Sequence, residues 1–208
     1  DCIADNISFI KNTPEARILH SNRLDYQDTF EEENFVDQYS LDDTPFGAPQ
    51  IDAALQYKIL LRQVFISAPT VFAQKALLVE MNGFDEQIPM IEDWPMWLKV
   101  TSAGYKIYYL DKATVKYRLH SASASSMSNR TRLFSRVEEM KELVYKHYIY
   151  PHITFTEKAL HKYNFLRMRL FNLTGMNKGY KLCRFINKAT GLPVLKYSAA
   201  MARLVSKS

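Results

Sequence analysis

Hydrophobic and polar residues along the chain follow two periods, one typical of helices and one typical of strands. Within 51–62, for example, Leu55, Ile59 and Leu60 recur at helical spacing and mark one buried face. Short runs rich in Val, Ile and Tyr separate such segments and favour strands. The pattern predicts helices over 2–11, 51–62, 76–81, 92–104, 131–150, 157–173 and 197–205, and strands over 17–20, 64–72, 106–110 and 113–117. This succession of helices and strands indicates an α/β protein.

Local turn and helix-end signals are strongest in the middle of the chain. Asn82 and Gly83 predict a tight turn, because both residue types tolerate positive φ. Gly104 suits the position just after the C-terminus of a helix. The segment between these signals therefore holds one short helix that ends at Gly104.

The start of that helix carries two adjacent acids, Glu92 and Asp93, followed by Pro95. Acids suit the positive N-terminal end of a helix, and proline fits its first turn. The helix start is also expected to lower the pKa of Asp93 and keep its carboxylate ionised. At the N-terminus of the chain, by contrast, Asp1 and Asp5 are interpreted as a helix cap and a solvated helix position rather than as a metal motif.

Charge divides the chain into two parts. The segment 156–208 holds eleven Lys or Arg and one acid, a balance of +10, whereas the rest of the chain carries −5. Such a split indicates a change of environment or partner along the chain. With the helical pattern beyond 131, it predicts a first domain over 1–128 and a helical, basic region over 129–208.

The two cysteines and the apolar runs exclude some classes of protein. Cys2 and Cys183 lie far apart, so they predict no disulfide framework and favour a reducing compartment. No run approaches the ~18 apolar residues that a membrane span requires. A cytoplasmic protein is therefore expected.

An ordered set of short motifs carries a family resemblance. The set consists of GFDE at 83–86, EDW at 92–94, WL at 97–98, AGYK at 103–106, and YR at 117–118 with His120. In this order and spacing, the chain resembles the second half of a family 2 glycosyltransferase domain of the GT-A type. The resemblance implies a partial GT-A-like mixed sheet with flanking helices, followed by a helical C-terminal extension. Asn82 and Pro95 depart from the family pattern.

The resemblance also implies roles for particular residues. Asp93 would be the general base that takes a proton from the acceptor hydroxyl, with Glu92 as its positioning neighbour. Trp94, Asp85 and Trp97 would bind the acceptor, Arg118 and His120 would contact the donor diphosphate or the metal, and Pro69–Thr70 would lead into the acceptor side of the cleft. Two blander interpretations stay open: the acids cap a helix, and the tryptophans pack in the core, which is preferred for Trp97.

Asp1 corresponds to a position just past the family's Asp-x-Asp metal motif. The donor-binding half and most ligands for a divalent cation, Mn²⁺ or Mg²⁺, are therefore expected upstream of residue 1, and this chain alone is expected to be inactive. The predicted function is hexosyl transfer from a nucleotide-sugar donor to a glycan or lipid-linked acceptor, in bacterial surface polysaccharide synthesis. The alternative is a non-catalytic glycan- or membrane-binding module derived from that fold. A glycosidase is a weaker alternative. Its two carboxylates must face each other across ~5 to 9 Å, whereas Glu92 and Asp93 are adjacent in sequence and should diverge.

Three further segments are assigned by composition. The acidic stretch 25–50 is expected to be a surface loop, with a lid near the acceptor as the alternative. The Ser-rich run 121–128 is expected to be a loop over the donor or a plain linker. The basic segment 156–208 is expected to be a helical appendage that packs on the domain, with peripheral contact with the inner face of the cell membrane as a nearly equal alternative. No nucleic-acid motif accompanies it.

Overall fold

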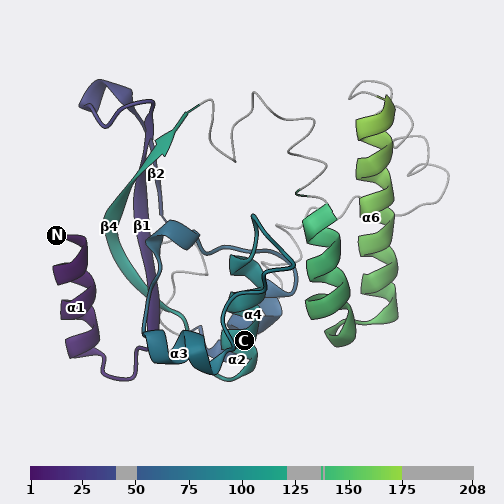
Figure 1. Cartoon of the computed structure of the whole chain (residues 1–208), viewed down its shortest axis with the longest axis horizontal. Helices are drawn as coiled ribbons and strands as arrows, with labels where there is room; N and C mark the ends of the chain where they lie inside the picture. The colour runs from purple at the N-terminus through teal and green to yellow at the C-terminus, as the bar shows by residue number, and fades with distance from the viewer. Residues whose placement is uncertain (41–50, 121–136, 138, 175–208) are drawn as a thin grey trace. The chain divides into compact units, whose positions relative to one another are not determined.

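The computed structural model describes residues 1–40, 51–120, 137 and 139–174 (Figure 1). The chain forms two compact units, Asp1–Arg130 and Thr131–Ser208. The first unit is a mixed α/β unit with a four-stranded sheet and flanking helices. This confirms the α/β class. The second unit is helical where it is described.

The sheet is organised around strand β1 (Ile18–Gln27). Strand β4 (Tyr108–Leu119) runs parallel to it along almost its whole length. Strands β2 (Phe35–Tyr39) and β3 (Phe72–Ala73) pair antiparallel with opposite ends of β1. Figure 1 shows β1 and β4 as the two long, twisted strands of the unit. The first half of β1 is almost completely buried, because it lies at the centre of this sheet.

Strand boundaries are where the sequence-based predictions fail. The strand predicted over 17–20 extends to Gln27, and part of the predicted acidic loop 25–50 forms β2 instead. The strand predicted over 64–72 is mostly irregular, with a short 3-10 turn, η3 (Ala68–Thr70), and only its last residue belongs to a strand, β3. The two strands predicted over 106–110 and 113–117 are one strand, β4, with a bulge at its pairing to Ser21–Arg23. Pairing between distant segments decides all four outcomes, and it leaves little trace in local periodicity.

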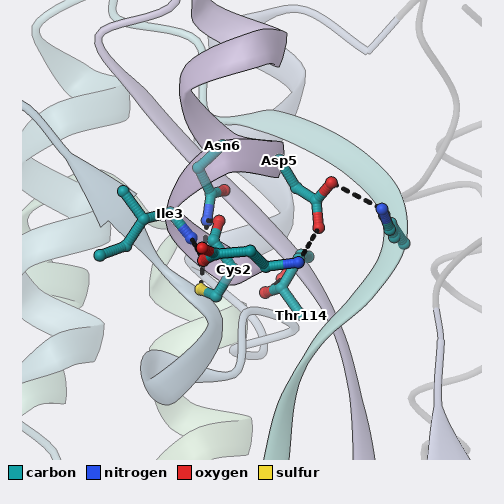
Figure 2. Close-up of polar contacts among 8 residues, drawn as sticks. Cys2, Ile3, Asp5, Asn6 and Thr114 are labelled. Carbon is teal, nitrogen blue, oxygen red and sulfur yellow. Dashed lines mark hydrogen bonds and ion pairs between the residues drawn. The ribbon is translucent and has the colours of Figure 1, made fainter.

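Helix α1 (Cys2–Asn12) begins with a side-chain cap, because the Asp1 carboxylate accepts a hydrogen bond from the backbone N–H of Ile3 at 3.0 Å. Figure 2 shows this turn, in which Asn6 donates to the Cys2 carbonyl. Asp5 accepts a hydrogen bond from Lys112 of β4 at 2.6 Å, which lowers the pKa of the Asp5 carboxyl. The cap at Asp1 is as expected, whereas Asp5, expected to be solvated, is half-buried in an ion pair with Lys112.

Three helices accompany the sheet: α2 (Ala53–Leu60), α3 (Lys75–Glu80) and α4 (Asp93–Ser102). Each matches a helix predicted from the sequence. The core between α2 and α4 is formed by buried apolar side chains, among them Ile59, Leu60, Met96, Leu98 and Val100. Gln56 joins α2 to the segment before β4, since its amide group donates to the carbonyl of Ile107 at 2.7 Å and accepts from the N–H of Ile107 at 2.9 Å. These bonds fix α2 against the sheet.

The N-terminus of α2 gives a first testable prediction. Asp52 caps the helix, and its carboxylate accepts a hydrogen bond from the N–H of Leu55 at 2.7 Å. Asp52→Ala leaves that donor to solvent, so we expect the free energy of unfolding to fall by about 1 kcal/mol. Urea denaturation measures the change. Glu86→Ala, at another exposed acid, is the control, and an equal loss there would contradict the capping role.

The second unit contains helical residues over 139–144, a π-helical turn (Tyr145–Ile149), a 3-10 turn (Tyr150–His152) and helix α6 (Phe155–Thr174). Thr154 and Glu157 cap α6 reciprocally: each side chain accepts a hydrogen bond from the other residue's backbone N–H, at 3.2 and 3.0 Å. Tyr145 packs against His161 and Phe165 of α6. The predicted helix over 197–205 and the Ser-rich run 121–128 lie outside the described residues.

Candidate functional site

An open pocket of about 420 Å³ lies beside the start of α4. Its lining comes from the η3–β3 segment, from α3, from the loop after α3 and from the first turn of α4. The lining residues are Ala68, Val71, Phe72, Ala73, Leu78, Phe84, Glu92, Asp93 and Trp97. The volume falls within the range of small-molecule sites, and the wall is mostly apolar with two carboxylates and one indole. Both predicted catalytic residues, Glu92 and Asp93, and one of the three predicted acceptor-binding residues, Trp97, are therefore brought together.

The local backbone explains why the two acids reach the pocket. Met90 has a positive φ of 77°, which turns the chain just before the helix. Glu92 takes the N-cap position of α4 without a side-chain hydrogen bond to the helix, and Asp93 begins the first turn. The Glu92 side chain is exposed, whereas Asp93 is half-buried. Capping does not occupy Glu92, so its carboxylate is available to a ligand.

The pKa of Asp93 is raised, and the prediction from the helix start is wrong. Burial of the carboxyl is the largest cause, and the negative charge of Glu92 adds to it. The backbone amides of Trp94 and Asp93 and the indole N–H of Trp97 act in the opposite direction but do not reverse the shift. Desolvation thus outweighs the helix terminus here. A raised pKa makes the ionised carboxylate a better proton acceptor.

The two tryptophans have different surroundings. Trp94 is 5% exposed, and its indole N–H donates to the Leu60 carbonyl at 2.8 Å. It does not line the pocket, so the structure offers no support for its predicted role in acceptor binding. Trp97 is 3% exposed, as preferred from the sequence, yet one part of it lines the pocket. Trp97 therefore packs in the core and also contacts the pocket.

The GFDE segment contributes its phenylalanine rather than its aspartate. Asn82 and Gly83 adopt the predicted turn, with φ values of 59° and 64°. Phe84 then lines the pocket, while the Asp85 carboxylate accepts a hydrogen bond from the N–H of Gln87 at 3.0 Å and does not line it. Lys99 of α4 holds the turn in place, since its ammonium donates to the carbonyls of Met81 and Gly83. The predicted role of Asp85 in acceptor binding is therefore not supported by its position.

Arg118 and His120 are not brought to the pocket. Phe72 of the pocket wall pairs with Leu19 of β1, whereas Arg118 pairs with Tyr26, seven residues further along the same strand. At ~3.3 Å per residue, this register corresponds to roughly 23 Å along β1. Neither Arg118 nor His120 is among the lining residues, so this pocket gives no support for their predicted contact with the donor diphosphate or the metal, which stays a prediction.

A metal site is not formed by the residues that the structure describes. Among them, no three His, Cys, Asp or Glu side chains gather closely enough to hold an ion. His120 alone is one ligand of the several that Mn²⁺ or Mg²⁺ needs. The expected cation therefore stays a prediction, and no chemical step is assigned to it.

Sequence reasoning missed most of the apolar wall. Val71, Phe72, Ala73 and Leu78 carry no chemical signal, and only the fold places them beside Asp93. The one available signal was the Pro69–Thr70 step, which lies in η3 between the lining residues Ala68 and Val71.

Within the described parts of the chain, no helix combines the length and the apolar character needed to cross a bilayer. Comparisons with protein-family models, with curated proteins and with solved structures found no significant match. The geometry of the pocket and the motif set are therefore the basis for a functional proposal.

Proposed function

We propose that this chain is the acceptor-side part of a family 2 type glycosyltransferase, which transfers a hexose from a nucleotide-sugar donor to a hydroxyl group of a glycan or lipid-linked acceptor. The observation that carries the proposal is the position of Asp93, whose half-buried carboxylate lies in the wall of an open pocket. A sugar hydroxyl that enters the pocket can reach this carboxylate. The motif set around Asp93 supplies the reaction class.

The walls of the pocket suit a sugar. Phe72 and Phe84 offer aromatic surface to the C–H face of a pyranose ring, and the carboxylates of Glu92 and Asp93 accept hydrogen bonds from its hydroxyl groups. In this proposal Asp93 removes the proton of the attacking hydroxyl, and Glu92 orients the acceptor. The raised pKa of Asp93 favours that proton transfer.

The proposal can be tested by filling the pocket. Ala68 is exposed and lines the pocket, so Ala68→Trp narrows it without disturbing the core. In the full-length gene product, assayed with a panel of nucleotide sugars and Mn²⁺ or Mg²⁺, we expect transfer to the acceptor to fall at least about tenfold, because acceptor positioning is lost. Hydrolysis of the donor by water should persist, since water still fits.

Ala54→Trp is the matched control, because Ala54 is an exposed alanine of α2 that does not line the pocket. It should retain transfer. Equal transfer by the Ala68→Trp and wild-type proteins would remove the pocket from the acceptor path. Absence of transfer from every donor tested would argue against the transferase itself.

A second candidate function is a glycan-binding module without catalysis. It is favoured by the distance between the pocket and Arg118 along the sheet register. The lining residues that the structure describes then include no cation to offset charge on a leaving diphosphate. In this case the full-length product would bind glycans without consuming any nucleotide sugar. The membrane-binding form of this alternative, and the peripheral membrane position, depend on 156–208, of which only residues up to 174 are described.

A further inference from the structure

Trp97 presents a buried hydrogen-bond donor that forms no full hydrogen bond with an acceptor among the described residues. The Trp97 residue is only 3% exposed, and its Nε1 atom is buried and has no hydrogen-bond partner within the described residues. Trp94, three residues earlier on the same helix, donates to the Leu60 carbonyl and so shows the usual arrangement. Buried donors without a partner are rare in folded proteins, and each calls for an explanation.

The unpaired donor lies beside an acceptor. Asp93 and Trp97 are four residues apart on α4, so their side chains emerge from the same face of the helix, and both line the pocket. The indole N–H points toward the Asp93 carboxyl and, as a hydrogen-bond donor, acts to lower its pKa, so the two groups face each other. The geometry between them nevertheless falls short of a full hydrogen bond, because Nε1 has no hydrogen-bond partner within the described residues. One atom that both accepts and donates a hydrogen bond would complete the arrangement.

The charge of the pocket narrows the choice of ligand. Among the described residues, its lining includes the carboxylates of Glu92 and Asp93 but no lysine, arginine or histidine. An anionic ligand would be repelled and would find no cationic partner there. A hydroxyl group is neutral, accepts through its oxygen and donates through its proton. It therefore fits the two groups in a way that a carboxylate or phosphate does not.

Building on the proposed function, we propose that Trp97 and Asp93 together bind one hydroxyl group of an uncharged sugar. The hydroxyl oxygen accepts a hydrogen bond from Nε1 of Trp97, and its proton is donated to the carboxylate of Asp93. Trp97 is thus a binding residue that directs the hydroxyl toward Asp93, and the pocket selects neutral sugars over acidic ones.

The two tryptophans make a direct measurement possible. With ¹⁵N-labelled indole groups, the chain gives two indole signals, and Trp97→Phe assigns them by removing one. On titration with methyl glycosides of neutral hexoses, we expect a saturable shift of the Trp97 signal, while that of Trp94, bonded to Leu60, stays in place. Methyl glucuronides should shift the Trp97 signal much less.

Asp93→Asn provides a second variant in case Trp97→Phe fails to fold, because it keeps the indole as a reporter. It should weaken the affinity read from the Trp97 signal by about tenfold, the effect of losing a hydrogen bond to a charged group. A Trp97 signal that ignores all neutral hexosides, or that responds equally to glucuronides, overturns the inference.

The outcomes separate this inference from the proposed function. If hexosides shift the signals of backbone amides elsewhere but not the Trp97 indole signal, the chain binds sugar but not at the proposed Trp97–Asp93 site. If the Trp97 signal shifts as expected while the full-length product shows no transfer, the hydroxyl-binding site is supported and the transferase function is contradicted.

Discussion

Replacement of Asp93 by Asn is expected to lower the rate of sugar transfer by roughly 10²- to 10⁴-fold, the usual contribution of a general base. Asparagine keeps the shape of the side chain but cannot take a proton at neutral pH. The measurement is acceptor glycosylation by the full-length gene product at saturating donor. Asp37→Asn, at an exposed acid of β2 outside the pocket, should keep the wild-type rate.

The stability of the Asp93→Asn variant should not fall with its transfer rate. Burial raises the pKa of Asp93, so the folded protein binds this proton more tightly than the unfolded chain does. The ionised carboxylate therefore costs stability once the pH rises above the ordinary range of aspartate. A neutral asparagine avoids this cost, and the thermal midpoint of Asp93→Asn at pH 7 should equal or exceed that of the wild type. A large drop in the midpoint would mean that lost activity reflects lost structure.

The pH dependence of transfer gives an independent check on Asp93. Its raised pKa places the acidic limb of the rate profile above the ordinary range of aspartate. The charge of Glu92 contributes to that shift, so Glu92→Gln should move the limb to lower pH. An unchanged limb in Glu92→Gln would show that another group controls the profile.

Acidification is expected to destabilise the fold through His20, by up to about 3 kcal/mol between pH 7 and pH 4. His20 is 1% exposed, and neither ring nitrogen has a hydrogen-bond partner among the described residues. Its ring packs against Phe65 and Tyr109, with centroid distances of 6.3 and 5.2 Å. Burial lowers the pKa of His20 from 6.5 to about 4.

The sign of the effect follows from proton binding. Between pH 6.5 and 4, the unfolded chain protonates His20 while the folded protein keeps it neutral. The unfolded state binds more protons in this window, so stability is complete above pH 6.5 and is lost as the pH falls toward 4. Below the folded pKa, both states are protonated and the contribution of His20 no longer changes.

His20→Leu tests this prediction, because leucine has a similar volume and cannot be protonated. Urea denaturation at a series of pH values should show that this variant lacks the His20 part of the acid-induced loss. Its stability at pH 7 should be retained or increased, since two unpaired buried nitrogens are removed. Phe65→Leu disturbs the same cluster but keeps the histidine, so it should lower stability at every pH and preserve the slope. Identical slopes in His20→Leu and the wild type would contradict the prediction.

Local structure was determined by the sequence itself. The turn at Asn82–Gly83, the positive φ of 88° at Gly104, the cap at Asp1 and the start of α4 at Asp93 all agree with the expectations from residue type. These features depend on contacts within a few positions along the chain, so that the residues that cause them are adjacent to their effect.

Only the tertiary structure decided the strands and the site. The extension of β1, the edge strand β2 and the continuous β4 result from pairing between segments far apart in sequence. The same pairing places Arg118 far along β1 from Phe72 of the pocket wall, which its motif alone did not indicate. Register is a property of two strands together, and no local pattern contains it.

Burial likewise decided the chemistry of single side chains in ways that the local sequence did not predict. The sequence identified Asp93 and Trp97 as candidates, but it predicted a lowered pKa for Asp93, and it left Trp97 between acceptor binding and the preferred core packing. The structure surrounds Asp93 with low-polarity neighbours that raise its pKa, and leaves the indole of Trp97 without an acceptor at the pocket wall. Desolvation and hydrogen-bond satisfaction depend on what the whole fold places around a group, which is why the motif could name the residues and only the fold could show their state.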